Sequence, residues 1–309
     1  MTDHHRRRKL DVDCEKCRCL LYALEKGNLS LAAEELGYTP SGMSRMMAAL
    51  EKEVGLPLLV RSRSGVAPTR ACRDLLPAFR EVVRSGDRLR LAADELKGVL
   101  RGEVQVATAY SVFFKPLANL AHRFSDLYPG VKIGIREGRS SLLMRDIEEQ
   151  RLDFCIISLR PGDCEWLPLF DDEMVAWLPP HHPCAKAESY PLKALESEPY
   201  IQFYPGEETD SELACRKHGV TPDLRYTAAD SFAAYEMVEA GLGVALQNGL
   251  FDGLWSGEVV SRRLSPPVIV PIGVAVPKRE VISPAARRFR DFAAAEGWEQ
   301  LQSVKPGKR

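Results

Sequence analysis

The stretch of residues 70–98 constrains this chain most, because its pattern is that of one long amphipathic helix. Its seam residues alternate by four and three positions over about three heptads, which is typical of a coiled coil. They are Leu75, Phe79, Val82, Gly86, Leu89, Ala93 and Leu96. Such a stripe has nowhere to be buried in a lone helix, so we expect a homodimer through this linker helix, with Gly86 as a weak point of the seam. The alternative is that the helix packs on the C-terminal part of its own chain.

The residues before the linker helix are predicted to form three short helices, each followed by a glycine that favours a left-handed helix end. They span Cys14–Lys26, Leu31–Leu36 and about residues 40–54, the last with Thr39 as its cap and Pro40 at its first position. One face of the third helix is expected to be buried and carries Met43, Met47, Leu50 and Val54. The opposite face carries Ser41, Ser44, Arg45 and Ala48. A helix that presents small polar residues and an arginine after a tight turn suits the major groove of DNA.

A β-hairpin is predicted after the third helix. Two extended stretches within Leu56–Thr69 flank a tip that is rich in serine, arginine and glycine. This pattern favours a wing that carries Arg61 and Arg63 near the phosphate backbone. Three helices and a hairpin also occur in domains that bind no DNA, and in such a domain Ser44 and Arg45 would be solvated surface.

The distribution of charge separates the two ends of the chain. The 309 residues have a formal net charge of −1 and an ordinary globular composition, with 45% apolar and 28% charged residues. Residues 1–101 hold 19 Lys and Arg against 14 Asp and Glu, whereas the remainder holds 23 against 29. A basic front joined to an acidic back suggests that only the front meets a polyanion.

From Gly102 onward, strand-like and helix-like stretches alternate, which predicts a mostly parallel α/β sheet. The expected strands lie near Glu103–Ala109, Val131–Glu137, Leu152–Ser158, Met174–Leu178, Tyr200–Tyr204, Leu224–Ala228, Gly243–Gln247 and Val268–Val276. The chain is therefore expected to join a small helical domain to a larger α/β domain through one long helix.

The N-terminal residues resemble the DNA-binding region of LysR-type transcriptional regulators, without gaps from Leu20 to Cys72. The similar runs are Gly27-Asn28-Leu29-Ser30-Leu31-Ala32-Ala33-Glu34-Glu35-Leu36, Ser41-Gly42-Met43-Ser44-Arg45, Leu50-Glu51, Gly55-Leu56-Pro57-Leu58-Leu59-Val60-Arg61 and Pro68-Thr69. Thinner similarity to the same family covers nearly all of the remaining chain, through Gly102–Ala107, Phe124–Val131, Leu152–Ile156 and Val238–Ala245.

The resemblance implies a regulator of bacterial transcription that binds double-stranded promoter DNA and responds to a small-molecule effector. It implies a winged helix-turn-helix over residues 10–70, a coiled-coil dimerisation helix over 71–98, and a two-lobed, periplasmic-binding-protein-like α/β effector domain over 102–300. Crossings between the lobes are expected near Leu178–His182 and Pro267–Pro271. The family also implies a homotetramer, and RNA polymerase is a further candidate partner.

The family's DNA contacts map onto named residues of this chain. They are Thr39, Pro40, Ser41, Ser44 and Arg45 on the third helix, with Arg61 and Arg63 on the wing. Ser41 and Ser44 would donate to a base edge or a phosphate, and Arg45 would pair with a guanine or clamp a phosphate. Met46, Ala48, Ala49, Leu59 and Cys72 depart from the residues common in the family, which leaves the strength of the phosphate contacts open.

Candidate effector contacts follow from position, because ligands of such sheets bind at the carboxyl ends of strands, beside helix N-termini. The candidates are Thr108, Tyr110, Ser111, Ser140, Ser141, Phe203, Tyr204, Asp230, Ser231, Gln247 and Asn248. Hydroxyls and free backbone N–H groups at these places would suit a carboxylate or another anionic group. The alternative for several of the serines is a helix cap without a ligand.

Other chemistry is not expected. The spacing of Cys14, Cys17 and Cys19 invites zinc, but no second ligand pair follows, so we expect no metal. The run His181–Cys184 fits a turn better than a ligand cluster. Without a nucleophile motif, a phosphate-binding loop or a triad, neither enzymatic activity nor a cofactor is expected. The chain also lacks an apolar run of about 18 residues and a secretory signal, so we expect a cytoplasmic protein with reduced cysteines and no membrane contact.

Two other functions fit parts of the sequence. A solute-binding receptor would share the C-terminal fold, but it needs a secretory signal and has no use for the first 70 residues. A redox sensor on the same scaffold would use thiol oxidation in place of a ligand. Its candidate residues are Cys155, Cys164, Cys184 and Cys215, although nothing in their spacing marks a pair.

Overall fold

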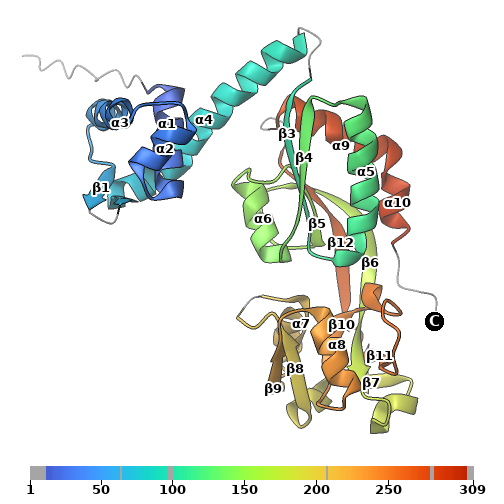
Figure 1. Cartoon of the computed structure of the whole chain (residues 1–309). Helices are drawn as coiled ribbons and strands as arrows, with labels where there is room; N and C mark the ends of the chain where they lie inside the picture. The colour runs from blue at the N-terminus through green and yellow to red at the C-terminus, as the bar shows by residue number, and fades with distance from the viewer. Residues whose placement is uncertain (1–11, 63–64, 97–99, 207, 279–281, 305–309) are drawn as a thin grey trace, which may run out of the picture. The chain divides into compact units, whose positions relative to one another are not determined.

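The computed structural model describes residues 12–62, 65–96, 100–206, 208–278 and 282–304 (Figure 1). The chain divides into two compact units, residues 1–98 and residues 99–309, and each is described by itself. Among the helices of the described ranges, none is long and apolar enough to cross a membrane.

The first unit contains helices α1 to α4 and one hairpin. Their bounds are α1 (Cys14–Lys26), α2 (Leu29–Glu35), α3 (Pro40–Val54), β1 (Leu59–Ser62), β2 (Gly65–Pro68) and α4 (Arg70–Leu96). The predicted bounds of the first and third helices are confirmed, because Asp13 and Thr39 cap them and Gly27 and Gly55 end them in the left-handed conformation. The second helix begins two residues earlier than predicted, since the Asn28 side chain accepts hydrogen bonds from two N–H groups of its first turn.

The apolar face of α3 lies in the core of the first unit, as predicted. Met43, Met47 and Leu50 are buried, and Val54 packs against the same cluster. Cys72, one of the departures from the family pattern, is also fully buried in this cluster. The Cys72 side chain therefore packs in the core and does not belong to the exposed face of α3.

The first half of α4 belongs to this core as well, which corrects part of the predicted coiled-coil seam. Phe79 is 5% exposed, and Leu75 and Val82 pack against the same cluster of side chains from α1 and α3. These three residues of the predicted seam therefore pack within their own chain. The predicted apolar stripe is present, but in this half of the helix it packs against α1 and α3 of the same chain and not against a second α4. A domain of this size buries too little apolar surface without α4.

Gly86 lies where α4 passes close to α1. A Cβ atom at this position would lie 2.6 Å from Cys14 Sγ, so the glycine permits a close approach of two helices and is not a weak point of a dimer seam. Next to it, Arg18 of α1 donates to the Asp87 carboxylate at 2.7 Å. Beyond this point the predicted seam residue Leu89 is 73% exposed, whereas the side chain of Leu96 lies outside those described.

The second unit is built on one sheet with the strand order β4-β3-β5-β12-β6-β11-β7, in which β10 also pairs with β6, and a separate parallel pair β8-β9. The strands are β3 (Gly102–Thr108), β4 (Val131–Glu137), β5 (Phe154–Ser158), β6 (Glu165–Leu178), β7 (Ser189–Pro191), β8 (Pro199–Phe203), β9 (Asp223–Ala228), β10 (Ala245–Asn248), β11 (Val260–Ser265) and β12 (Ile269–Val276). The helices are α5 (Phe114–Leu127), α6 (Ser140–Glu148), α7 (Asp210–His218), α8 (Ser231–Glu239), α9 (Pro284–Glu296) and α10 (Trp298–Gln302). Short 3-10 turns are η1 (Ser111–Phe113), η2 (Pro183–Lys186), η3 (Leu192–Glu196) and η4 (Gly249–Phe251).

Helices cover both faces of the sheet in the first lobe, which comprises β3, β4, β5, part of β6 and β12 (Figure 1). Side chains alternate along each strand. Val106 of β3 therefore packs with Phe124 of α5 and Phe289 of α9, whereas its neighbour Ala107 packs with Ile147 of α6. Because β3 pairs parallel with both β4 and β5, the carboxyl ends of the three strands lie side by side at the edge that faces the second lobe.

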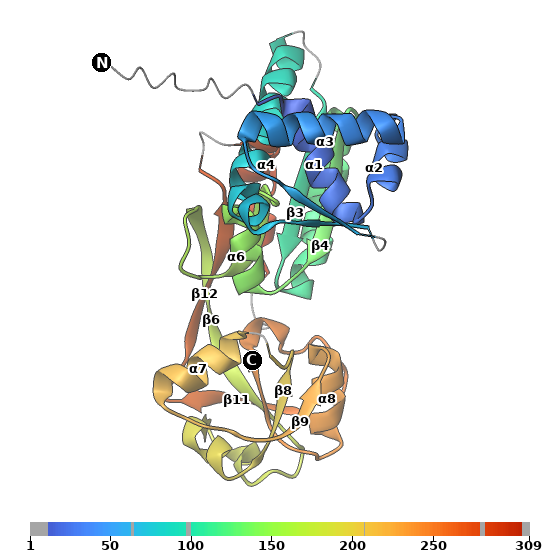
Figure 2. The ribbon, with the colours of Figure 1, turned by 90° about the vertical axis from the view of Figure 1, so that its left-hand side faces the viewer.

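The two lobes are joined by the antiparallel strands β6 and β12 (Figure 2). The first part of β6, up to Glu173, pairs with β12, and its last part, Met174–Leu178, pairs with β10 and β11 in the second lobe. The predicted crossing at Leu178–His182 was therefore wrong, since those residues follow the crossing strand. The predicted crossing near Pro267–Pro271 is confirmed, because β12 begins there.

Two features of the sheet differ from the prediction. It is less parallel than expected, since β12 and β6 run antiparallel to their neighbours. In addition, β6 begins nine residues earlier than predicted, at Glu165, and β7 and β11 were not predicted. These nine added residues, Glu165–Glu173, include Pro168 and four acidic residues, which is a composition typical of a loop, and pairing with β12 overrides this local preference.

Candidate functional site

The exposed side of α3 carries small polar residues next to an arginine. Pro40, Ser41 and Arg45 are exposed, and Ser44 is half-buried. The Thr39 hydroxyl accepts a hydrogen bond from the Gly42 N–H at 3.1 Å, so this predicted DNA contact also caps the helix. The arrangement presents donors on a convex helix surface, which is the shape that enters a major groove.

The wing is joined to this surface through an arginine. Arg61 on β1 donates to Ser44 Oγ of α3 at 2.8 Å. A guanidinium has five N–H donors, so this single bond leaves donors for a phosphate. The structure thus brings the predicted contacts of the helix and the wing into one surface, with the exception of Arg63, which lies outside the described residues.

Glu51 is a residue of this site whose role was not predicted. Its carboxylate accepts hydrogen bonds from the backbone N–H groups of Leu58 at 2.7 Å and Leu59 at 3.0 Å. The other strand of the wing is fixed by the Val66 N–H, which donates to the Gly27 carbonyl at 2.8 Å. These bonds set the position of the wing relative to α3. No local pattern could have shown them, because they join the helix to residues beyond the next turn.

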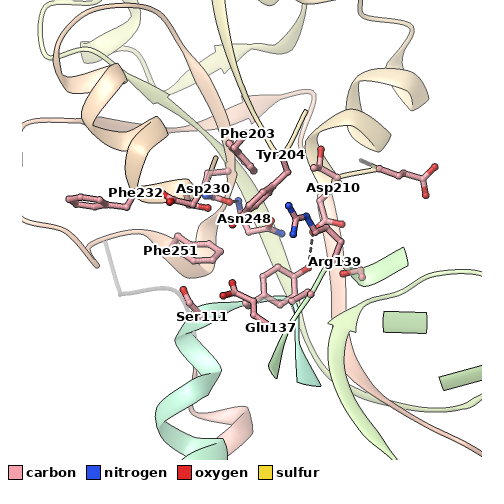
Figure 3. Close-up of a pocket in the computed structure, with 18 of the residues that line it drawn as sticks. Ser111, Glu137, Arg139, Phe203, Tyr204, Asp210, Asp230, Phe232, Asn248 and Phe251 are labelled. Atoms are coloured by element: carbon pink, nitrogen blue, oxygen red, sulfur yellow. Dashed lines mark hydrogen bonds between the residues drawn. The ribbon is translucent and has the colours of Figure 1, made fainter. Parts of the chain in front are cut away.

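A cavity of about 330 Å³ lies between the two lobes of the second unit (Figure 3). Nine of the eleven candidate effector contacts line it: Tyr110, Ser111, Ser140, Phe203, Tyr204, Asp230, Ser231, Gln247 and Asn248. The carboxyl ends of strands from both lobes therefore meet at one cavity.

Thr108 and Ser141 do not line the cavity, which corrects the sequence prediction. Thr108 is fully buried, and its hydroxyl donates to the Tyr110 carbonyl at 3.0 Å. The Ser141 hydroxyl donates to the Glu208 carboxylate at 3.1 Å and accepts from Arg160 Nε at 3.1 Å. Both hydroxyls serve the structure of the cavity wall.

Asp210 at the start of α7 connects the second lobe to the first. Its carboxylate accepts hydrogen bonds from Tyr110 Oη, Ser158 Oγ and the Arg160 guanidinium, each at 2.7 Å. The ion pair is buried, with side-chain exposures of 6% for Arg160 and 8% for Asp210. Burial and the nearby Asp210 charge raise the pKa of Tyr110 well above its ordinary value, so its hydroxyl keeps the proton that it donates. Ser140 Oγ lies 2.9 Å from Ser158 Oγ and extends the network.

This network changes the expectation of an anionic ligand. The hydroxyl and guanidinium donors at the ends of β3 and β5 already bind carboxylates of the chain itself, Asp210 and Glu208. An incoming anion would have to compete with these buried partners. In this conformation the hydroxyls at these strand ends are therefore not free for an anionic ligand.

Three buried polar side chains lie beside the same cavity. Gln247 and Asn248 line it, with residue exposures of 1% and 5%, and Asp172 on β6 is fully buried next to them. In the part of the chain that the structure describes, Gln247 Nε2, Asn248 Nδ2 and both Asp172 carboxylate oxygens have no hydrogen-bond partner. Burial raises the pKa of Asp172 to about 7, although nearby Asn248 and backbone N–H groups oppose the shift.

Several residues of the site were not predicted as contacts, among them Arg139, Arg160 and Asp210. Arg139 and Arg160 follow β4 and β5, so the rule that found the serines also covers these positions. The guanidinium of Arg139 lies 3.9 Å from the ring centre of Tyr204. Asp210 could not be found this way, because it follows no strand directly and reaches the first lobe only through the fold.

The motifs set aside in the sequence have structural roles. Cys17 and Cys19 are fully buried in the core of the first unit, where burial raises the pKa of each thiol to about 11. His182 accepts a hydrogen bond from the Cys184 N–H at 3.1 Å and its other ring nitrogen lies 3.0 Å from Glu198. This segment is a capped turn, as predicted.

Both units match family models of known proteins. Residues 15–73 match the family model of the bacterial regulatory helix-turn-helix protein, lysR family, and residues 97–298 match the model of the LysR substrate binding domain. A probable hydrogen peroxide-inducible genes activator of Mycobacterium leprae is 33% identical over 74% of this chain and 75% of its own length. The transcriptional regulator YvbU of Bacillus subtilis is 27% identical over 87% of this chain and 93% of its own length.

Solved structures share the fold along nearly the whole chain. A full-length OxyR variant from Pseudomonas aeruginosa has a TM-score of 0.70 at 21% identity, covering 96% of this chain and 99% of that one. The LysR family regulator CbnR has a TM-score of 0.60 at 17% identity, covering 93% and 99%. The two family models together span most of the sequence, and the chain therefore belongs to the LysR family of transcription regulators, DNA-binding proteins that respond to a ligand and catalyse no reaction.

Proposed function

We propose that α3 and the wing bind promoter DNA in the cytoplasm, and that a small molecule in the interlobe cavity controls this binding. The observation that carries the proposal is the pairing of an exposed polar helix face in one unit with a cavity between two lobes in the other. Two distinct sites in one chain are what ligand control of DNA binding requires. The parts would be residues 10–70 for DNA, 71–98 for dimerisation and 102–300 for the effector.

The assembly that we propose is a homodimer through the second half of α4, with a homotetramer as the next order. Leu89 and the helix beyond it extend past the residues that pack against α1, and Leu89 is 73% exposed. An exposed leucine on a long helix is stabilised by a partner helix. Contact with RNA polymerase at the promoter would turn DNA binding into regulation.

The DNA proposal is tested by titrating a duplex from the chain's own upstream region with the full-length protein. Arg45→Ala is expected to weaken binding by about 10-fold to 100-fold, the loss for an arginine that contacts a base edge. Arg225→Ala removes the same charge from an exposed site of the second unit and serves as the control. Equal affinity of the Arg45→Ala variant and the control would contradict the assignment of α3 to DNA.

The effector proposal is tested by filling the cavity. Ser111 lines the cavity and is exposed, so Ser111→Trp can occupy the space without removing a buried contact. We expect this variant to bind promoter DNA as the wild type does, but to lose its response to cellular metabolites in a reporter strain. A full response from the variant would show that the effector binds elsewhere.

A redox sensor is the second candidate, since two relatives are described as probable hydrogen peroxide-inducible genes activators. The thiolate is the reactive form of cysteine, and burial raises the pKa of Cys155, Cys164 and Cys215, the last to about 11. These shifts favour unreactive thiols. We therefore expect regulation to survive substitution of Cys155, Cys164, Cys184 and Cys215 by serine or alanine, and a lost response would favour the redox sensor.

A further inference from the structure

The charges that line the interlobe cavity do not balance. Four carboxylates line it against two guanidiniums: Glu137, Glu208, Asp210 and Asp230 against Arg139 and Arg160. The excess of negative charge matters only if the cavity is an effector site, so the inference drawn from it rests on the function proposed above. A site with this balance attracts a cation and repels an anion.

The contacts of these six side chains show which charges a ligand can use. Arg160 is neutralised by Asp210 at 2.7 Å, and Glu208 accepts hydrogen bonds from Ser141 at 3.1 Å and Arg216 at 3.2 Å. Glu137 forms no ion pair within the described ranges, and Asp230 uses one oxygen to cap α8 through the Ala233 N–H at 2.8 Å. The sixth side chain is Arg139, whose guanidinium lies over the Tyr204 ring at 3.9 Å. Glu137 and Asp230 together exceed the charge of Arg139 by one, so an excess of negative charge remains for a ligand.

Aromatic rings line the same cavity as these two carboxylates. Figure 3 shows Phe251, Asp230 and Glu137 around it. Phe251 stacks on Trp255 with ring centres 6.1 Å apart, and Phe232 lies 5.8 Å from Trp255. All three rings line the cavity. The face of an aromatic ring attracts a cation, so the rings and the carboxylates favour the same kind of ligand.

Two buried amide side chains, Gln247 and Asn248, form what we call the cavity floor, and they indicate a ligand independently of the charges. Gln247 and Asn248 are 1% and 5% exposed and line the cavity. Among the described residues neither side-chain nitrogen forms a hydrogen bond, although the Asp172 carboxylate lies near that of Asn248. The Gln247 oxygen accepts from the Asn248 N–H at 2.9 Å, which directs its amide nitrogen elsewhere. Buried donors are nearly always paired, so a bound molecule that carries an acceptor would complete this floor.

We propose that the cavity binds an organic amine. Its protonated amino group would be held by Asp230 and Glu137 beside Phe251, and a hydroxyl or carbonyl oxygen of the ligand would accept from Gln247 and Asn248. A volume of about 330 Å³ suits a small metabolite with one ring or a short chain. This ligand class reverses the anionic effector expected from the sequence.

The test uses three probes that share a phenylpropyl skeleton: L-phenylalaninol, 3-phenylpropan-1-ol and 3-phenylpropionate. They carry an ammonium and a hydroxyl, a hydroxyl alone, and a carboxylate, respectively. Calorimetric titration of the full-length protein in phosphate buffer is expected to give the tightest binding for L-phenylalaninol, by about 10-fold or more over both others, because one charge-assisted hydrogen bond is worth that factor. Binding of 3-phenylpropionate as tight as that of L-phenylalaninol, or no binding of L-phenylalaninol, would overturn the proposal.

Two variants locate the amino group. Asp230→Asn keeps the cap of α8, since asparagine is as good a cap as aspartate, and Glu137→Gln keeps the side-chain length. Each variant is expected to bind L-phenylalaninol about 10-fold more weakly than the wild type and to bind 3-phenylpropan-1-ol with unchanged affinity. Glu236→Gln removes a charge from the exposed side of the same helix α8 and is the matched control. Equal losses in all three variants would overturn the proposed contacts.

The same titrations separate this proposal from the effector function on which it rests. If 3-phenylpropionate binds best and also changes promoter affinity, the cavity is an effector site and only the amine class is wrong. If L-phenylalaninol binds best to the wild type but no bound probe changes its promoter affinity, the amine class holds and the control of DNA binding is contradicted.

Discussion

The two units of this chain hold their arginines in opposite environments. Arg45 and Arg61 of the first unit are exposed, whereas the side chain of Arg160 in the second unit is 6% exposed and paired with Asp210. An exposed guanidinium keeps its donors for a phosphate from outside, while a buried one has already exchanged water for a carboxylate of its own chain. The arginines of the first unit are thus available for the DNA contacts that we propose, whereas Arg160 holds two lobes together.

The largest effect that tests this contrast is that of salt on DNA affinity. A dimer that neutralises about 6–10 phosphates should lose roughly 10³–10⁵ in affinity between 50 and 200 mM salt, because it releases counterions from the DNA. The unfolding free energy of the second unit should change little over the same range, since its ion pair is buried and poorly screened. Parallel fluorescence titrations measure both, and a flat DNA titration would show that the first unit does not bind through phosphates.

The second effect is the loss of the buried pair. Asp210→Ala leaves the charge of Arg160 buried without its partner, so the free energy of unfolding should fall by about 3–5 kcal/mol. Tryptophan fluorescence during urea unfolding measures this for one unit alone, because all four tryptophans lie in the second unit. The exposed pair Arg225–Asp223 is the control, and Arg225→Ala should cost less than about 1 kcal/mol. Similar losses in both variants would mean that the Asp210 network does not hold the lobes.

The third effect is the pH dependence that Asp172 gives to the second unit. Burial raises the pKa of its carboxyl to about 7, whereas aspartate in an unfolded chain titrates near pH 4. The folded protein therefore keeps a proton that the unfolded chain has lost between about pH 4 and pH 7, so stability falls as the pH rises through this window. Asp172→Asn stays neutral, and its advantage over the wild type should grow by up to about 3 kcal/mol between pH 5 and pH 7.

A second buried carboxyl makes the comparison with the variant necessary. Burial also raises the pKa of Asp153, to about 6, so the wild type alone would show a mixed pH dependence. Asp153 is present in both proteins, and its contribution cancels in the difference. If the unfolding free energies of the wild type and the Asp172→Asn variant run parallel from pH 5 to pH 7, then Asp172 is ionised in the folded protein.

The contrast between the units also explains what could be predicted from the sequence. The helices of the first unit have local causes, such as the Thr39 cap, Pro40 and the glycine that ends α3, and these residues stand next to each other in the chain. The residues that we propose to contact DNA follow from the same short segment. The role of Glu51 did not, because its partners Leu58 and Leu59 lie beyond the helix end.

In the second unit the sequence indicated positions but not partners. The rule that ligands bind at strand ends found Tyr110, Ser231 and Asn248 at the cavity. It could not show that Asp210, some 50 residues after Arg160 in the chain, fills the place of an anion. Long-range pairs of this kind depend on how the lobes meet, and no local periodicity records that.

The smallest effect tests α4, where the first unit has a close-packed contact of its own. Alanine at position 86 gains about 1 kcal/mol from helix propensity, but its Cβ would lie 2.6 Å from Cys14 Sγ, and overpacking costs about 1–3 kcal/mol. Gly86→Ala should therefore destabilise the wild type slightly, yet stabilise a Cys14→Ala background in which the sulfur is gone. Hydrogen exchange of α1 amides by mass spectrometry measures both changes. Destabilisation that is equal in the two backgrounds and varies with protein concentration would instead place Gly86 in a dimer seam.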